Sequence, residues 1–150
     1  MSLWMFVVMV AAGGAMLAFQ PPINAALREH VGVFESALIS FLVGTVILIV
    51  VVLLAGKGQL TAVRNASWWQ LLGGVIGAIF VTATLLSAKS IGVTGTIVAT
   101  LAGQMTAAVL IDRFGWAGMT PRPIDLPRIA GVALLVVAVA LINWSTWKKA

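Results

Sequence analysis

Cysteine is absent from this 150-residue sequence, and charged side chains are scarce. Without cysteine the chain can form neither a disulfide scaffold nor a thiol nucleophile. Charged residues make up 9% of the sequence, whereas a soluble domain carries about a quarter, so they cannot surround a 150-residue core. Apart from the adjacent Lys148 and Lys149, the nine basic residues are also scattered singly, and a nucleic-acid-binding surface needs them clustered on one face. We therefore expect neither a soluble fold nor a nucleic-acid partner.

Motifs of enzyme chemistry are missing as well. The sequence shows no nucleophile beside a base, no phosphate-binding loop and no cofactor motif. His30 is the single histidine and has no second His or Cys to complete a metal site. The four acids lie at the ends of apolar segments or between them: Glu29, Glu35, Asp112 and Asp125. We predict that the chain is not an enzyme, needs no cofactor or metal, and has no carboxylate at mid-membrane for proton coupling.

Long apolar runs dominate what is present. Apolar residues make up 61% of the sequence, and the mean hydropathy is +1.12. About 20 apolar residues are needed to cross a hydrocarbon core of about 30 Å, and each run has about that length. Lipid cannot satisfy free backbone groups, so each crossing should be a helix. We predict an all-α integral membrane protein, one membrane domain over 1–150, with five transmembrane helices at 3–26, 34–55, 68–88, 91–111 and 129–147.

The first run raises the question of a signal peptide. No Lys or Arg precedes it, and it continues from Leu3 past Phe19, whereas a secretory signal has a basic start and a shorter apolar core. We interpret it as the first crossing. Four short connections are predicted as loops: residues 27–33, residues 56–67, the pair Lys89–Ser90, and the proline-rich residues 112–128.

The distribution of basic residues barely specifies an orientation. With five crossings, one side of the membrane would hold five of them: Lys57, Arg64, Arg113, Arg122 and Arg128. The other side would hold four: Arg28, Lys89, Lys148 and Lys149. Cytoplasmic loops normally carry a clear excess of Lys and Arg. Either other factors fix one orientation, or copies insert both ways and pair antiparallel.

Small residues follow one face of the fourth segment at steps of four. Such a stripe lets another helix approach closely. It could serve packing within one subunit, but because it spans most of the segment we interpret it as a subunit interface: Gly95, Ala99, Gly103 and Ala107.

Polar residues inside the apolar segments are candidates for solute binding, because uncharged polar groups are costly there without a partner. Gln20 and Asn24 share a helix face beside Pro21 and Pro22, which lack the N–H that a helix needs. Gln104 lies near the middle of the fourth segment. We predict a substrate-binding set whose members could alternatively serve only helix packing: Gln20, Asn24, Ser36, Ser40, Thr100 and Gln104.

Two stretches resemble a known family. Residues 20–28, with the sequence QPPINAALR, are similar to the first-helix motif of the YdcZ-like proteins of the drug/metabolite transporter superfamily. Residues 103–115, from GQMTA to IDRFG, are similar to that family's fourth-helix signature. The likeness extends over the whole chain in length and in number of segments.

The resemblance implies a function that composition alone does not. Superfamily members often have ten helices in two inverted halves, so this chain would be one half, completed by an identical chain or a paralogue facing the other way. It implies a multi-pass protein of the inner membrane, in contact with lipid, that transports small metabolites or drug-like compounds by alternating access. The alternatives are a non-transporting scaffold or accessory subunit and, less favoured because no ring of charge appears, a passive channel.

Overall fold

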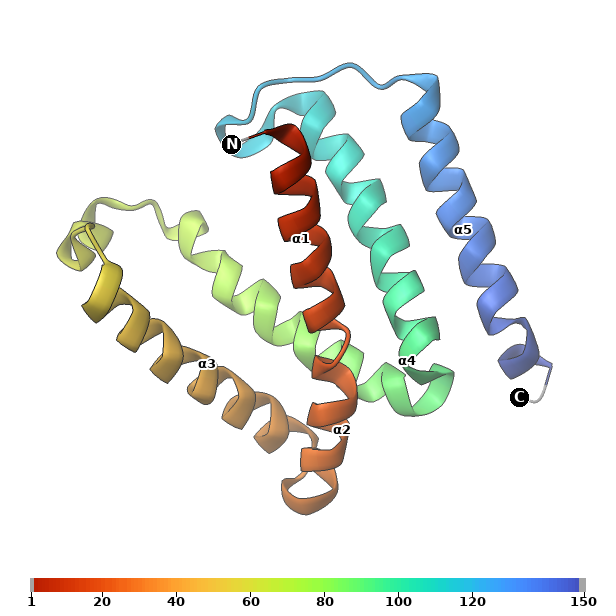
Figure 1. Ribbon diagram of the computed structural model, residues 1–150, viewed down its shortest axis with the longest axis horizontal. Helices are drawn as coiled ribbons and strands as arrows, with labels where there is room; N and C mark the ends of the chain where they lie inside the picture. Colours follow the sequence, from red (N-terminus) through yellow and green to blue (C-terminus); the bar gives the residue numbers. More distant parts are fainter. Residues whose placement is uncertain (1, 149–150) are drawn as a thin grey trace. The chain divides into compact units, whose positions relative to one another are not determined.

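Helices are the sole regular secondary structure in the part of the chain that the computed structural model describes, residues 2–148, with the side chains of 145–147 left aside. Lys149, counted among the basic residues above, lies outside the described residues. The long helices are α1 (Leu3–Leu17), α2 (Gln20–Val31), α3 (Val33–Ala55), α4 (Leu72–Phe114) and α5 (Leu126–Trp147) (Figure 1). Short 3₁₀ turns cover Leu60–Asn65, Trp68–Leu71 and Trp116–Gly118. The prediction of an all-α membrane protein is confirmed.

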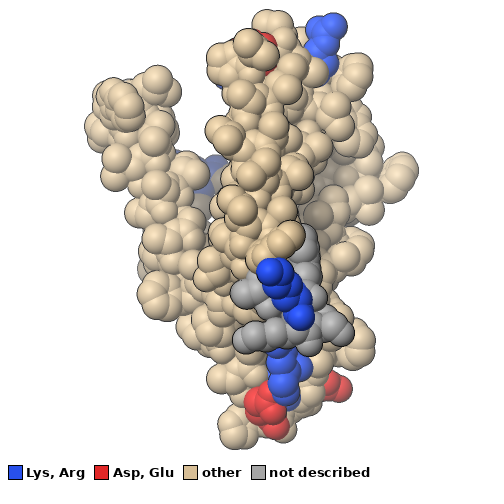
Figure 2. Space-filling view, turned by 90° about the vertical axis from the view of Figure 1, so that its right-hand side faces the viewer, with Lys and Arg blue, Asp and Glu red and all other residues tan. Residues whose placement is uncertain are grey.

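Burial follows the pattern expected in lipid rather than in water. Large apolar side chains are exposed along every long helix, and on the face seen in Figure 2 surface without Lys, Arg, Asp or Glu predominates. The most buried positions include four polar residues: Asn24, Ser36, Thr96 and Asn143. In a soluble protein exposed apolar patches of this extent would cause association. Here lipid chains can cover them, and the polar groups are withdrawn among the helices.

The first apolar segment forms two helices, α1 and α2, rather than one. Pro21 and Pro22 stand at the start of α2 and have no N–H to donate to the carbonyls one turn earlier, those of Leu17 and Ala18. Residues 18–19 form a turn between the helices. Proline is well tolerated in the first turn of a helix, so α2 begins at Gln20.

A single glycine connects α2 to α3. Gly32 has φ 99° and ψ 168°, a conformation that is essentially restricted to glycine. The predicted loop over 27–33 is therefore wrong in extent, and Glu29 and His30 lie in the last turns of α2. The last hydrogen bond of α2 joins the Gly32 N–H to the Arg28 carbonyl at 2.9 Å. The basic residues of the last turn, Arg28 and His30, interact favourably with the negative end of the helix dipole.

Replacing Gly32 by alanine should destabilise the chain by about 1–3 kcal/mol, the cost of holding a Cβ-bearing residue in this backbone region. A Cβ there would also lie 2.5 Å from Glu35 Oε2. Thermal unfolding in detergent would measure the loss. Gly58→Ala is the matched control, because a Cβ on Gly58 would meet nothing within 4 Å and its φ is not positive. Equal unfolding temperatures for the two variants would contradict the conclusion that the backbone conformation at residue 32 requires glycine.

The stretch containing α4 is too long for one crossing. Trp68–Phe114 spans 47 residues, about 70 Å at 1.5 Å per residue, against a hydrocarbon core of about 30 Å. Gly92, with φ 73° and ψ 169°, interrupts it with a non-helical backbone. The break gives two helical pieces, 72–91 and 93–114, each able to cross the membrane. Three other stretches are also long and apolar enough: Leu3–Val31, Val33–Ala55 and Leu126–Trp144.

The chain falls into two compact units near this break, residues 1–89 and 90–150, so each is described by itself. In the first unit a small apolar core joins α3 to the first piece of α4 through Ala37, Val81 and Leu85. Gly77 allows a close approach there, since a Cβ on it would lie 3.4 Å from the ring of Phe41.

In the second unit the later piece of α4 packs antiparallel to α5. At one end Asp112 Oδ2 lies 3.6 Å from Nη1 of Arg128. At the other end Gly95 contacts Oδ1 of Asn143. The start of α5 is capped by Asp125, whose Oδ1 accepts a 3.0 Å hydrogen bond from the N–H of Arg128.

Candidate functional site

Three polar residues of α2 and α3 form a hydrogen-bonded cluster. Ser36 Oγ donates to the backbone carbonyl of Asn24 at 2.9 Å, and Ser40 Oγ donates to Asn24 Oδ1 at 2.6 Å. Asn24 and Ser36 are almost completely buried, whereas Ser40 is half-buried. The tight connection at Gly32 makes this possible, because it folds α3 back along α2 and brings residues 12 and 16 positions apart into contact.

Ser40 also opens onto a pocket of about 230 Å³. Its lining combines an apolar floor with two polar side chains that the sequence analysis selected, and consists of Gln20, Ser40, Phe41, Gly44, Thr45 and Leu48. The Thr45 hydroxyl donates to the Phe41 carbonyl of its own helix at 2.8 Å. The Gln20 side chain forms no hydrogen bond with the described part of the chain, and the Ser40 hydroxyl, which donates to Asn24, can still accept one from a solute.

Charged residues gather at the end of α2 beyond this cluster. Arg28 Nη1 donates to the carbonyl of Leu85 at 2.6 Å, which ties α2 to the first piece of α4. Glu29 Oε1 lies 3.2 Å from Lys89 Nζ and 4.0 Å from Nε of Arg28. One acid thus faces two basic groups, and the exposed pair with Lys89 contributes little to stability.

Of the predicted binding residues, two lie in the other unit. Thr100 is half-buried and Gln104 is exposed. Among residues 2–148 no hydrogen bond is formed by the side chain of either. The structure therefore brings together four of the predicted residues within the first unit: Gln20, Asn24, Ser36 and Ser40. In the second unit the Gln104 amide is exposed on the surface.

The small-residue stripe divides into two parts. Gly95 is buried, and a Cβ on it would clash with Asn143 Oδ1 of α5 in the same chain. Ala99 is half-buried, whereas Gly103 and Ala107 are exposed, and a Cβ on Gly103 would meet nothing within 4 Å. The first part serves packing within the chain, and the second part is open to a further helix.

Asn143 was missed by the sequence analysis. Its Nδ2 donates to the Val139 carbonyl at 2.9 Å, while its buried Oδ1 has no hydrogen-bond partner in the part of the chain described. The side chain lies against Gly95, whose missing Cβ leaves room for it. A lone asparagine inside the last apolar segment was the available signal, since an amide in lipid needs a partner.

Comparison with known proteins decides the family. The family model described as "Putative inner membrane exporter, YdcZ" matches residues 5–141. The chain belongs to the YdcZ family. It is 28% identical over 138 residues to the inner membrane protein YdcZ of Escherichia coli (strain K12), an alignment covering 89% of this chain and 91% of that protein. None of the solved structures matches this chain.

Membership of the YdcZ family fixes the broad function. The chain is a multi-pass protein of the inner membrane and a membrane transporter. The resemblance noted in the sequence is confirmed.

Proposed function

We propose that the chain moves a small polar solute across the inner membrane by alternating access, as one half of an antiparallel pair, and does not convert the solute chemically. The observation that carries the proposal is the pocket of the first unit, which Gln20 and Ser40 both line within an apolar span. Polar groups within a membrane-spanning segment cost free energy, so their presence marks a candidate functional site. Ser40 is held in place by Asn24, which fixes the direction of its hydroxyl.

The size of this pocket favours a shared chamber. Small-molecule sites usually enclose about 300–1,000 Å³, and the pocket has about 230 Å³. Two copies of it facing each other would reach that range. The apolar side chains Phe41 and Leu48 on its wall would then accept the hydrophobic part of the solute.

Two further observations support pairing with an inverted copy. The basic residues, five against four, favour neither orientation strongly. Gln104 is exposed beside Gly103, where another helix could approach closely. A partner helix there would cover the open part of the stripe at Gly103 and Ala107, and we propose that the neighbouring Gln104 amide contacts the solute.

Reconstitution into liposomes tests the proposal. Under a solute gradient the wild-type chain should carry flux, and Gln104→Leu should reduce it about tenfold, the effect of losing about 1.4 kcal/mol of solute interaction. Thr106→Val is the control, because the Thr106 hydroxyl is already bonded to the Ala102 carbonyl at 2.8 Å. Crosslinking should show the same dimer for all three. Full flux by Gln104→Leu would contradict its assignment, and absence of flux from the wild type across a panel of gradients would favour the scaffold alternative.

A further inference from the structure

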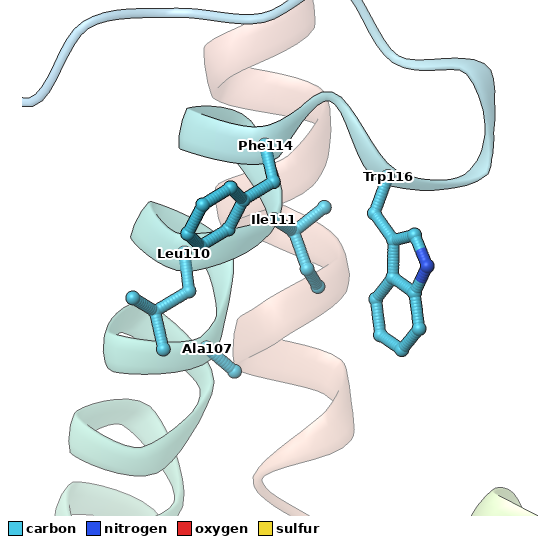
Figure 3. Close-up of a pocket in the computed structure, with 5 residues that line it drawn as sticks. All are labelled: Ala107, Leu110, Ile111, Phe114 and Trp116. Atoms are coloured by element: carbon cyan, nitrogen blue, oxygen red, sulfur yellow. The ribbon is translucent and has the colours of Figure 1, made fainter.

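An apolar pocket of about 430 Å³ lies at the end of α4, separate from the polar pocket described above. Its lining contains only apolar side chains and consists of Ala107, Leu110, Ile111, Phe114 and Trp116. Figure 3 shows four of these projecting from α4 and the Trp116 ring facing them from the turn that follows, with Phe114 and Trp116 on opposite sides of Ile111. Of its lining residues the transport proposal uses only Ala107, the last residue of the small-residue stripe.

Trp116 forms one wall of the pocket because the chain turns sharply at Gly115. Gly115, with φ 62°, ends α4 in the left-handed conformation typical of helix C-termini. A Cβ there would lie 2.7 Å from the Met119 carbonyl oxygen and from Pro121 Cγ. The chain can therefore turn back sharply, and Trp116 comes to lie beside the helix it has just left.

We expect the pocket to extend from the membrane surface into the hydrocarbon. The ion pair between Asp112 and Arg128 marks the polar edge of the second unit, and Ala107 lies more than one helical turn deeper within the apolar span. Tryptophan is enriched at the headgroup level, which agrees with the place of Trp116 directly after the helix end. An occupant should thus have one apolar end and one polar end.

Two arginines near the polar edge, Arg113 and Arg122, form no salt bridge in the described part of the chain. Arg128 is taken by Asp112 at 3.6 Å and by Asp125 at 3.9 Å. Arg113 precedes Phe114 directly, and the backbone N–H of Arg122 donates to the Asp112 carbonyl at 2.7 Å, which brings it to the same helix end.

We infer that this pocket binds an anionic phospholipid of the surrounding bilayer, with an acyl chain against Ile111 and Phe114 and the phosphate between Arg113 and Arg122. Guanidinium groups bind phosphate through paired hydrogen bonds, and basic groups at a membrane surface attract anionic lipid. The apolar lining alone would accept any hydrocarbon. The two unpaired charges specify the headgroup.

Native mass spectrometry of the full chain in detergent would test the inference with phosphatidylglycerol and phosphatidylcholine of identical acyl chains. The wild type should bind phosphatidylglycerol about tenfold more tightly, equivalent to about 1.4 kcal/mol. The double variant Arg113→Gln/Arg122→Gln should lose this preference. Lys57→Gln/Arg64→Gln is the matched control, because it removes two charges predicted on the same side of the membrane and should keep the preference.

Filling the pocket provides an independent test. Ala107→Trp should weaken binding of both lipids about tenfold, whereas Ala108→Trp adds the same side chain at a neighbouring position that does not line the pocket. Equal binding of the two lipids by the wild type would overturn the inference, as would full binding by Ala107→Trp. A change from dimer to monomer in Ala107→Trp with unchanged lipid binding would assign the pocket to a second copy instead.

Discussion

Adding three lysines between α3 and the start of α4 should abolish transport by the variant on its own. The changes Gln59→Lys, Thr61→Lys and Ala62→Lys raise the basic residues predicted on that side from five to eight, against four opposite. Such an excess places this side in the cytoplasm. If every copy then faces the same way, no antiparallel pair can form, and the shared chamber is lost. Flux per inserted copy in membrane vesicles would measure the effect.

Coexpression with an oppositely biased variant should restore transport. Lys57→Gln, Arg64→Gln and Ser90→Lys together reverse the imbalance, so the two variants supply one copy in each orientation. Because the natural chain has no cysteine, a single cysteine at Ser67 would report orientation by labelling from either side. Serine at positions 59, 61 and 62 is the neutral control. Undiminished transport by the lysine variant alone, with all copies labelled from one side, would contradict antiparallel pairing.

Removing the Ser40 hydroxyl should reduce transport about tenfold, if it supplies one hydrogen bond worth about 1.4 kcal/mol to the solute. Ser40 lines the polar pocket and is held by Asn24 Oδ1. Ser36 provides a matched comparison one helical turn away, since its fully buried hydroxyl bonds the Asn24 backbone and does not line the pocket. Ser36→Ala should lower stability by about 1 kcal/mol while each folded copy still transports.

Flux normalised to folded protein distinguishes the two serine variants, with thermal unfolding in detergent measured in parallel. Ser87→Ala serves as a baseline, because its hydroxyl is exposed and bonds only its own helix at the Ala83 carbonyl. Equal losses of flux in Ser36→Ala and Ser40→Ala would mean that Ser40 acts through the geometry of the cluster and not by its own contact with the solute. Unchanged flux in Ser40→Ala would remove this residue from the proposed site.

The helical membrane fold could be predicted from the sequence alone because each membrane crossing is determined by the length and apolar character of its own segment. Each apolar run has the length of one crossing, and free backbone groups exclude other structures. The loop over 27–33 was wrong because charged residues were assumed to end a helix. Arg28, Glu29 and His30 instead complete α2, and the actual end is set by Gly32, whose special backbone conformation a hydropathy pattern does not reveal.

Part of the candidate site could be predicted from the sequence. Spacing placed Gln20 with Asn24, and Ser36 with Ser40, each on one helix face, but it could not show that the pairs meet. That depends on the one-residue connection at Gly32. Similarly, the stripe of small residues was visible in the sequence, yet the contact between Gly95 and Asn143 needed the path of α5, which residue spacing does not determine.

The hydrogen bonds of Asn24 have a mechanical consequence. They tie α2 to α3, and Arg28 ties α2 to the first piece of α4, so these three helices should move as one rigid block. The first crossing has a hinge at the turn of residues 18–19. The two prolines that follow leave carbonyls of the preceding turn unbonded. If the chamber opens alternately to its two sides, α1 can swing about this hinge while the block carries Ser40 unchanged.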